Sequence, residues 1–217
     1  MVEGIEQRIK SYHEEVTSGK RAMPVGPCAK CLQQPAFFTL HDGRQRSFRW
    51  VLCGIVRVFM TILLRWKCPL CAGTFTDYPC FAVPYKRYVR DDLERLSARY
   101  VEQDKASYRS VVRSGGLATG YEDHAERQLE HSTVWKWLGW HATQEKRSAS
   151  MLEWIRYRNP SHGIFRAMVP VAPRKYRSER RKRELEQARL LLQAARVYRD
   201  LTDRLTFPGS ETPCLQM

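Results

Sequence analysis

Two cysteine pairs with a β-rich segment between them decide the fold: Cys28-Ala-Lys-Cys31 and Cys68-Pro-Leu-Cys71, separated by 36 residues. Two thiolates three positions apart on a tight turn can both face one ion, and a second such turn completes the tetrahedral four-sulfur shell that Zn²⁺ favours. The pairs therefore predict one structural Zn²⁺ per chain, with Cys28, Cys31, Cys68 and Cys71 as its ligands. Four thiolates leave no open position for water, so the expected role of the ion is scaffolding.

Other uses of the four thiols are less consistent with the sequence. They could be unrelated buried thiols, or a redox site of the thioredoxin type, but neither pair lies in a βαβ pattern. Three further cysteines, Cys53, Cys80 and Cys214, lie outside the pairs. The pairing, more than the number of cysteines, indicates a metal site.

The segment between the pairs has the composition of β-strands. Val, Ile, Phe, Thr and Trp are frequent in FFTLHDGR (37–44), RSFRWVL (46–52) and IVRVFMTILLRWK (55–67). Asp42-Gly43 is a hairpin signal and Gly54 is a break, so three or four antiparallel strands are expected. Strands between two metal-binding turns are the layout of a zinc ribbon.

After Pro84 the pattern becomes helical. Apolar residues recur at spacings of three and four in 91–103, and further helices are expected over 105–113 and 125–141. The last helix is expected to begin with Ser178 as its N-cap and to reach about Leu205. Its apolar stripe should pack on the body of the protein or pair with a second subunit.

These patterns predict an α+β chain, with a small antiparallel zinc ribbon, a helical helix-turn-helix module and a C-terminal basic helix. Prolines between 160 and 173 indicate a linker before the last helix. The expected parts are an N-terminal helix or arm (1–23), the ribbon (24–84), the helical domain (85–158), the linker (159–177) and an amphipathic basic helix (178–206).

The charge of the chain favours a polyanionic partner. Its 217 residues contain 37 Lys and Arg against 23 Asp and Glu, a formal charge of +14. The acidic N-terminal segment lacks the apolar core of a secretory signal. The apolar stretch 51–64 is shorter than the roughly 20 residues that cross a bilayer. We therefore expect a cytoplasmic, nucleoid-associated protein that makes no membrane contact.

The sequence around the second cysteine pair resembles a known family. RWKCPLCAGTFTDYP (65–79), followed by VPYKRY (83–88), is similar to the zinc-ribbon segment near the N-terminus of bacterial insertion-sequence transposases and related small transposon-associated proteins. The resemblance covers about residues 26–141, and it implies a DNA-binding part of a mobile element with the same four cysteines as metal ligands. No pattern typical of a transposase nuclease domain follows His141, so no strand cleavage is expected.

Three groups of residues are candidates for contact with DNA. On the hairpin and the link after it, cations alternate with aromatic residues and could line an open face: Arg44, Arg46, Arg49, Lys86, Arg87 and Arg90. The segment HSTVWKWL (131–138) begins like a recognition helix, with Ser132, Thr133 and Lys136 placed to read bases. The run RKYRSERRKR (174–183) would dock phosphates through Arg174, Lys175, Arg177, Arg180, Arg181, Lys182 and Arg183.

Each group also has a simpler interpretation, because basic segments are often solvated surface and an aromatic helix can fill a core. The favoured function is a non-enzymatic, zinc-dependent DNA-binding protein of a mobile element. It would recognise target or element DNA or regulate transposition, with a transposase or other mobile-element proteins as partners. The alternatives are a nuclease or transposase subunit, and an adaptor that binds RNA or an acidic protein in a nucleoprotein complex.

Overall fold

The structure is a computed structural model of the chain, and it divides into two compact units. The residues that it describes are 2–24, 26–52, 54–103, 105–113, 127–166 and 177–205. Among these, the ribbon unit holds the residues up to Leu52 and from Val56 to Asp91. The helical unit holds residues 54–55 and those from Asp92 onward.

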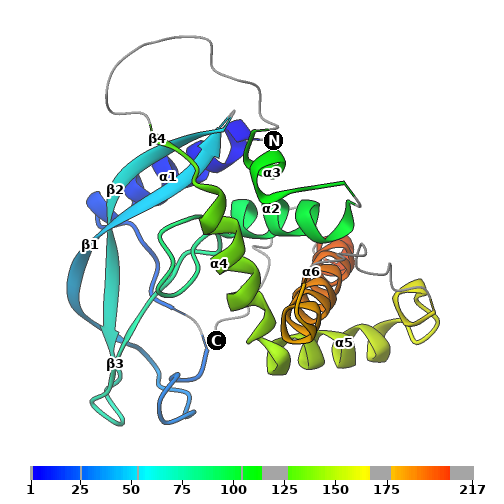
Figure 1. The fold of residues 1–217 in the computed structure, drawn as a ribbon. Helices are drawn as coiled ribbons and strands as arrows, with labels where there is room; N and C mark the ends of the chain where they lie inside the picture. The colour runs from blue at the N-terminus through cyan, green and yellow to red at the C-terminus, as the bar shows by residue number, and fades with distance from the viewer. Residues whose placement is uncertain are drawn as a thin grey trace. The chain divides into compact units, whose positions relative to one another are not determined.

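The ribbon unit contains a three-strand antiparallel sheet and one helix (Figure 1). β1 (Thr39–Leu52), β2 (Ile55–Lys67) and β3 (Thr74–Thr76) lie side by side in that order. β3 pairs with the end of β2, where Trp66 lies opposite Phe75. A two-residue strand, β4 (Arg127–Gln128), belongs to the helical unit. The predicted α+β class with an antiparallel sheet is therefore confirmed.

The prediction of a turn at Asp42-Gly43 is wrong, because both residues lie inside β1. The Asp42 carboxylate accepts a hydrogen bond from Arg65 Nη1 on β2 at 3.0 Å. A Cβ on Gly43 would lie 2.7 Å from Ile62 Cγ2, so the glycine admits a side chain of the neighbouring strand. The chain turns instead at Gly54, whose φ of +82° suits a residue without a Cβ.

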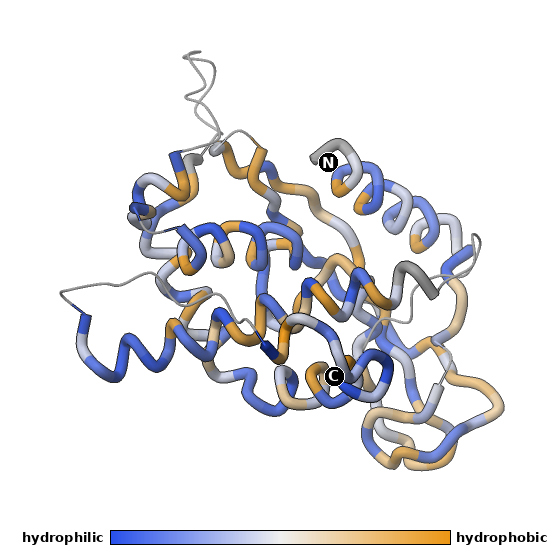
Figure 2. Tube along the Cα trace, turned by 90° about the vertical axis from the view of Figure 1, so that its right-hand side faces the viewer, coloured by the Kyte–Doolittle hydropathy of each residue, from blue (hydrophilic) through white to orange (hydrophobic). Residues whose placement is uncertain are grey.

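The N-terminal helix α1 (Val2–Thr17) packs into the ribbon unit instead of forming a separate arm. Its residues Ile5, Ile9 and Tyr12 are buried, and the Tyr12 hydroxyl donates to the carbonyl of Ile62 at 3.0 Å. Hydrophobic and hydrophilic residues alternate along this helix in Figure 2. The rest of that core comes from the sheet and the segment after it: Phe48, Trp50, Leu63, Phe81, Ala82 and Val89.

The helical unit is built around α6 (Glu179–Leu205). α4 (His131–Ala142) and α5 (Glu145–Arg158) both pack against α6, and α3 (Tyr108–Arg113) packs against α4. α2 (Arg90–Glu102) and the short 3-10 helix η1 (Gly163–Phe165) are its other helical elements in the described part of the chain. The Ser178 Oγ accepts from the N–H of Arg181 at 3.3 Å, which confirms the predicted N-cap.

The predicted linker does not separate the last helix from the helices before it. Met151 and Ile155 of α5 share one core with Leu191, Ala194 and Ala195 of α6. The apolar stripe of α6 thus packs on the body of its own unit, the first of the two outcomes expected for it. α4 also begins six residues later than the predicted helix 125–141, because β4 precedes it.

Candidate metal centre and basic surface

The four sulfur atoms of the cysteine pairs all lie within 4.8 Å of one another. Cys28 Sγ is 3.8 Å from Cys71 Sγ, and Cys31 Sγ is 4.0 Å from Cys68 Sγ. Four sulfurs placed tetrahedrally at about 2.3 Å from a zinc ion would be about 3.8 Å apart. The cluster is therefore spaced to hold a metal ion such as zinc, and it is the one such group found in the described part of the chain.

Each cysteine pair lies on a turn of the same construction. The N–H of Cys28 donates to the carbonyl of Gln33 at 2.8 Å, and the N–H of Cys68 donates to the carbonyl of Gly73 at 2.9 Å. Both bonds span five residues, and the residue after each pair has a positive φ: Leu32 (59°) and Ala72 (54°). Such backbone costs about 1–3 kcal/mol for a residue other than glycine, so surrounding contacts must hold both turns in shape.

Close packing between the two turns explains Gly73. A Cβ at this position would lie 2.6 Å from Lys30 Cδ and 3.2 Å from Cys71 Sγ. The flexible Lys30 chain could move aside, but a side chain here would also crowd Cys71 Sγ. The glycine therefore leaves room for Cys71 Sγ and for the Lys30 side chain from the first turn.

Hydrogen bonds and burial affect the thiols differently. The backbone N–H groups of Cys31 and Lys30 lower the pKa of Cys28 to about 6. The N–H of Gln33 also lowers the pKa of Cys31, but burial and the neighbouring thiols outweigh it and raise this pKa to about 11. Without a metal, Cys28 therefore loses its proton before Cys31, whereas a bound cation favours the thiolate at every position.

The four-cysteine cluster is buried on one side and open on the other. Cys28 and Cys68 are buried against Phe38 and Trp66, while Cys71 is exposed. The ring of Phe38 meets the ring of Phe75 edge-on at 4.9 Å. This apolar cluster is small, so a bound metal would add substantially to the stability of the turns.

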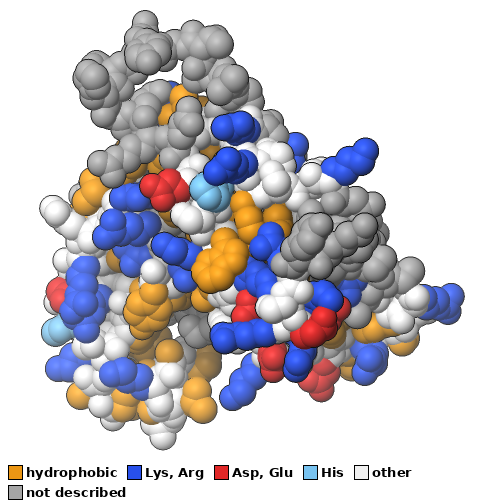
Figure 3. Space-filling view, viewed as in Figure 1, with side chains coloured by type: hydrophobic (Ala, Val, Ile, Leu, Met, Phe, Trp, Pro, Cys, Tyr) orange, Lys and Arg blue, Asp and Glu red, His pale blue; other side chains and the backbone are white. Residues whose placement is uncertain are grey.

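The ribbon unit carries a long stretch with an excess of positive charge, within which Arg65 pairs with Asp42 at 3.0 Å. Residues 43–90 contain nine Lys and Arg and a single acid, Asp77. Asp77 is buried and its carboxylate accepts from Arg21 Nη2 at 3.3 Å. Burial raises the pKa of Asp77, and the Arg21 charge opposes that rise. Lys and Arg side chains are frequent over the β1–β2 hairpin in Figure 3.

The structure brings the predicted cations of the hairpin and of the following link together. Arg49 pairs with Tyr88 in a parallel β-bridge, which places the link 85–90 beside β1. Arg46 Nη2 donates to the carbonyl of Lys86 at 2.6 Å, and Arg90 Nη2 donates to that of Ala82 at 3.3 Å. Burial lowers the pKa of Lys86. Arg44 and Arg87 are exposed, and we find no ion pair for either among the described residues.

The face of cations expected on the hairpin is not free of aromatic residues in β1. Side chains at every second position of a strand lie on the same face. Arg44, Arg46, Phe48 and Trp50 therefore all lie on one face of β1. They separate along the strand, because its first half is largely exposed and its second half is buried. Exposed cations lie at both ends of the hairpin: Arg44 in the first half of β1 and Arg57 close to the turn at Gly54.

The predicted recognition helix is partly buried. Val134 and Leu138 of α4 are fully buried, whereas Lys136 is exposed. Ser132 and Thr133 are half-buried, and the Ser132 hydroxyl donates to Glu130 Oε2 at 3.4 Å. A carboxylate thus lies at the start of the helix, where a recognition helix would meet DNA. Base reading by these three residues remains a prediction.

The basic run at the start of α6 divides into two sets. Arg177 and Arg181 face the protein: Arg177 Nη2 donates to the Tyr100 hydroxyl at 2.8 Å, and Arg181 Nη2 donates to the Tyr108 hydroxyl at 2.9 Å. The rings of these two tyrosines stack at 4.1 Å. Arg181 also contacts Glu184 and lies over the Trp135 ring.

The second set faces solvent: Arg180, Lys182 and Arg183. Arg180 pairs with Glu184, and Lys182 pairs with Glu179. Arg181, expected among the phosphate contacts, is 7% exposed and its guanidinium is bonded to protein, so we assign it to the core of the helical unit. Arg174 and Lys175 lie outside the described residues.

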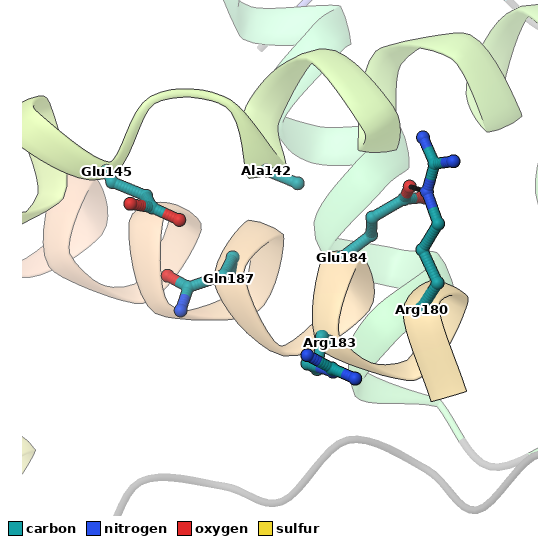
Figure 4. A pocket seen from close by; sticks show the side chains of 6 residues that line it. All are labelled: Ala142, Glu145, Arg180, Arg183, Glu184 and Gln187. Atoms are coloured by element: carbon teal, nitrogen blue, oxygen red, sulfur yellow. Dashed lines mark hydrogen bonds and ion pairs between the residues drawn. The ribbon is translucent and has the colours of Figure 1, made fainter. Parts of the chain in front are cut away.

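A shallow pocket beside this set does not have the charge of an anion site. Figure 4 shows its lining of Ala142, Glu145, Arg180, Arg183, Glu184 and Gln187. The two carboxylates offset the two guanidinium groups, and Glu184 is already paired with Arg180. The charged side chains that line the pocket therefore sum to no net charge.

Sequence reasoning missed the aromatic acceptors Tyr100 and Tyr108, which fix the buried arginines. Their spacing of eight residues crosses the break between α2 and α3, so no helical periodicity links them. None of the helices in the described residues is long and apolar enough to cross a membrane. Comparison of the chain with protein-family models, with curated proteins and with solved structures finds no match.

Proposed function

We propose that this chain is a non-enzymatic DNA-binding protein of a mobile genetic element. Cys28, Cys31, Cys68 and Cys71 would hold one Zn²⁺, which would brace the ribbon unit. The exposed cations of the hairpin and of α6 would contact phosphates. The mobile-element context rests on the resemblance of residues 65–88 to transposase zinc ribbons.

The observation that carries the proposal is the excess of positive charge in residues 43–90, where nine Lys and Arg stand against one acid. Their single acid is buried and paired with Arg21, so it neutralises none of the exposed cations. Arg46 and Arg90 donate to backbone carbonyls, which hold the guanidinium groups in place and leave their charge intact. Such a surface attracts phosphates, and each phosphate contact releases counterions.

The test is the salt dependence of DNA binding. Fluorescence anisotropy with a labelled duplex, over a series of NaCl concentrations, gives the slope of log K against log[salt]. Changing both Arg44 and Arg87 to Ala should lower the magnitude of the slope by about 2, because each lost phosphate contact lowers it by about 1. Lys10→Ala is the control, since Lys10 already pairs with Glu6 in the same unit.

The control variant should keep the wild-type slope. Absence of salt-dependent binding by the zinc-loaded wild-type protein would contradict the proposal. Tighter binding to an RNA duplex of the same sequence would favour the adaptor alternative instead.

A further inference from the structure

Tyr85 is the most exposed large apolar side chain of the ribbon unit, at 91%. Large apolar side chains usually bury much of their surface. Within the described part of the chain, Tyr85 makes no hydrogen bond and no ring contact. Its ring is therefore free on both faces and at its edge.

The turn that presents Tyr85 is strained. The N–H of Lys86 donates to the carbonyl of Val83 at 3.1 Å, which closes a tight turn with Pro84 and Tyr85 at its tip. Tyr85 has a φ of +62°. Proline followed by a residue of positive φ is the combination of a type II turn, whose third position favours glycine or asparagine. A tyrosine here costs backbone energy, and the ring makes no contact in the unit that would offset it.

The base of the turn is firmly held. Phe81, Ala82 and Val83 are buried, and an isolated antiparallel bridge joins Val83 to Lys86. The carbonyl of Lys86 also accepts from Arg46 Nη2 at 2.6 Å. The backbone on either side of Tyr85 is thus already fixed, so little conformational entropy of the turn would be lost when the ring binds a ligand.

The surroundings of the turn are cationic. The sequence from Tyr78 to Arg90 contains Lys86, Arg87 and Arg90 and no Asp or Glu. Arg46 also reaches this segment. An exposed aromatic ring among cations is the combination by which proteins bind unpaired nucleotides, because the cations hold the backbone and a base stacks on the ring.

We propose that Tyr85 is a stacking site for an unpaired base of DNA, either in a single strand or at a distorted step of a duplex. This inference rests on the proposed function and adds the class of DNA structure that the ribbon unit prefers. Lys86 and Arg87 would contact the phosphates on either side of the stacked base.

The experiment compares two fluorescein-labelled probes, a dT20 strand and a 20-base-pair duplex, by anisotropy at one fixed salt concentration. The main variant is Tyr85→Gly, which removes the ring and suits the positive φ. It should fold at least as well as the wild type in thermal unfolding. Its affinity for dT20 should fall roughly tenfold, while its affinity for the duplex should change less than about twofold.

Two further variants complete the test. Tyr85→Trp keeps a stacking ring and should retain wild-type affinity for dT20. Tyr157→Ala is the matched control, because Tyr157 is 82% exposed on a regular helix of the other unit. It should bind both probes as the wild type does.

The outcomes separate the two proposals. If the wild type binds the probes and Tyr85→Gly binds dT20 equally well, the stacking site is overturned while the proposed function stands. An equal loss on dT20 and duplex would also overturn it, since Tyr85 would then not select unpaired bases. If the wild type binds neither probe, the proposed function fails. Tighter binding to rU20 than to dT20 would overturn the assignment to DNA.

Discussion

The two units both carry many arginines, and both hold some of them with carboxylates; in the ribbon unit these include Arg21 and Arg65, which pair with Asp77 and Asp42. In the ribbon unit, Arg46 and Arg90 donate to backbone carbonyls. In the helical unit, Arg181, Arg196 and Arg199 form ion pairs with carboxylates. A carbonyl orients a guanidinium group without cancelling its charge, whereas a carboxylate cancels it. The difference indicates that Arg46 and Arg90 keep their positive charge in the basic segment 43–90, whereas carboxylates offset the charges of Arg181, Arg196 and Arg199.

The units also differ in what stabilises them. The ribbon unit has a four-cysteine cluster between two strained turns, with a small apolar cluster beside it. The helical unit packs α4 and α5 against the apolar stripe of α6. We therefore expect loss of the metal to affect the ribbon unit alone.

The largest effect is expected for Cys68→Ser. Cys68 is fully buried, and without it the site loses one of four ligands. Because the binding free energy of a structural zinc, on the order of 10 kcal/mol, is also folding free energy, the ribbon unit should lose its cooperative unfolding transition. Metal analysis and thermal unfolding with near-ultraviolet circular dichroism measure both changes.

Cys80→Ser is the control for this substitution, because Cys80 is exposed and lies outside the cluster. It should keep the wild-type zinc content. If Cys68→Ser kept the zinc content and the unfolding transition of the wild type, the cluster would have no structural role. The difference in stabilisation between the two units would then not hold.

A smaller effect is expected for two arginines of the basic run, Arg181 and Arg183, which should differ in whether they contribute to stability or to DNA binding. Arg181→Ala removes a buried guanidinium, takes the donor from the Tyr108 hydroxyl and leaves Glu184 with Arg180 alone as its donor. It should lower the free energy of unfolding by about 3 kcal/mol and leave the salt slope of DNA binding unchanged. Arg183→Ala, at an exposed position, should keep the stability and lower the magnitude of the slope by about 1.

Denaturant unfolding of both variants measures the change in stability, and salt titration of their DNA binding measures the change in slope. A reduced slope in Arg181→Ala, at unchanged stability, would mean that the basic run acts as a whole and that the assignment of Arg181 to the core is incorrect.

The smallest effect concerns pH. Hydrogen bonding by Arg181 lowers the pKa of Glu184 below its ordinary value. A carboxyl with a lowered folded-state pKa stabilises the fold above its ordinary pKa, and this contribution disappears as the pH falls through the folded value. Glu184→Gln should therefore cost about 0.5–1 kcal/mol at pH 7 and nothing once the wild-type carboxyl is protonated.

Denaturant unfolding of wild type and Glu184→Gln between pH 7 and strongly acidic conditions measures the difference. Glu186→Gln is a suitable control, because Glu186 is exposed on the same helix. A difference between wild type and Glu184→Gln that stays constant with pH would show that the pair does not titrate as argued.

Several local features of this protein could be predicted because they depend on neighbours in the sequence. The spacing of the cysteine pairs predicted which four thiols would meet, and the polar residue before the last helical stripe predicted the N-cap at Ser178. A tight turn and a helix start each involve a few consecutive residues. The Asp42-Gly43 signal failed for the opposite reason, because the approach of Ile62 from β2 decides what that glycine does.

The sequence by itself thus determined the α+β class, the candidate metal ligands and the excess of positive charge. The tertiary structure decided which charges reach solvent. Arg177 and Arg181 turn inward because tyrosines from α2 and α3 lie beside the start of α6, while Arg183 stays outside. It also decided that α1 belongs to the ribbon unit. Contacts between residues far apart in the chain leave no local pattern, since they depend on which surfaces bury the most apolar area when the chain folds.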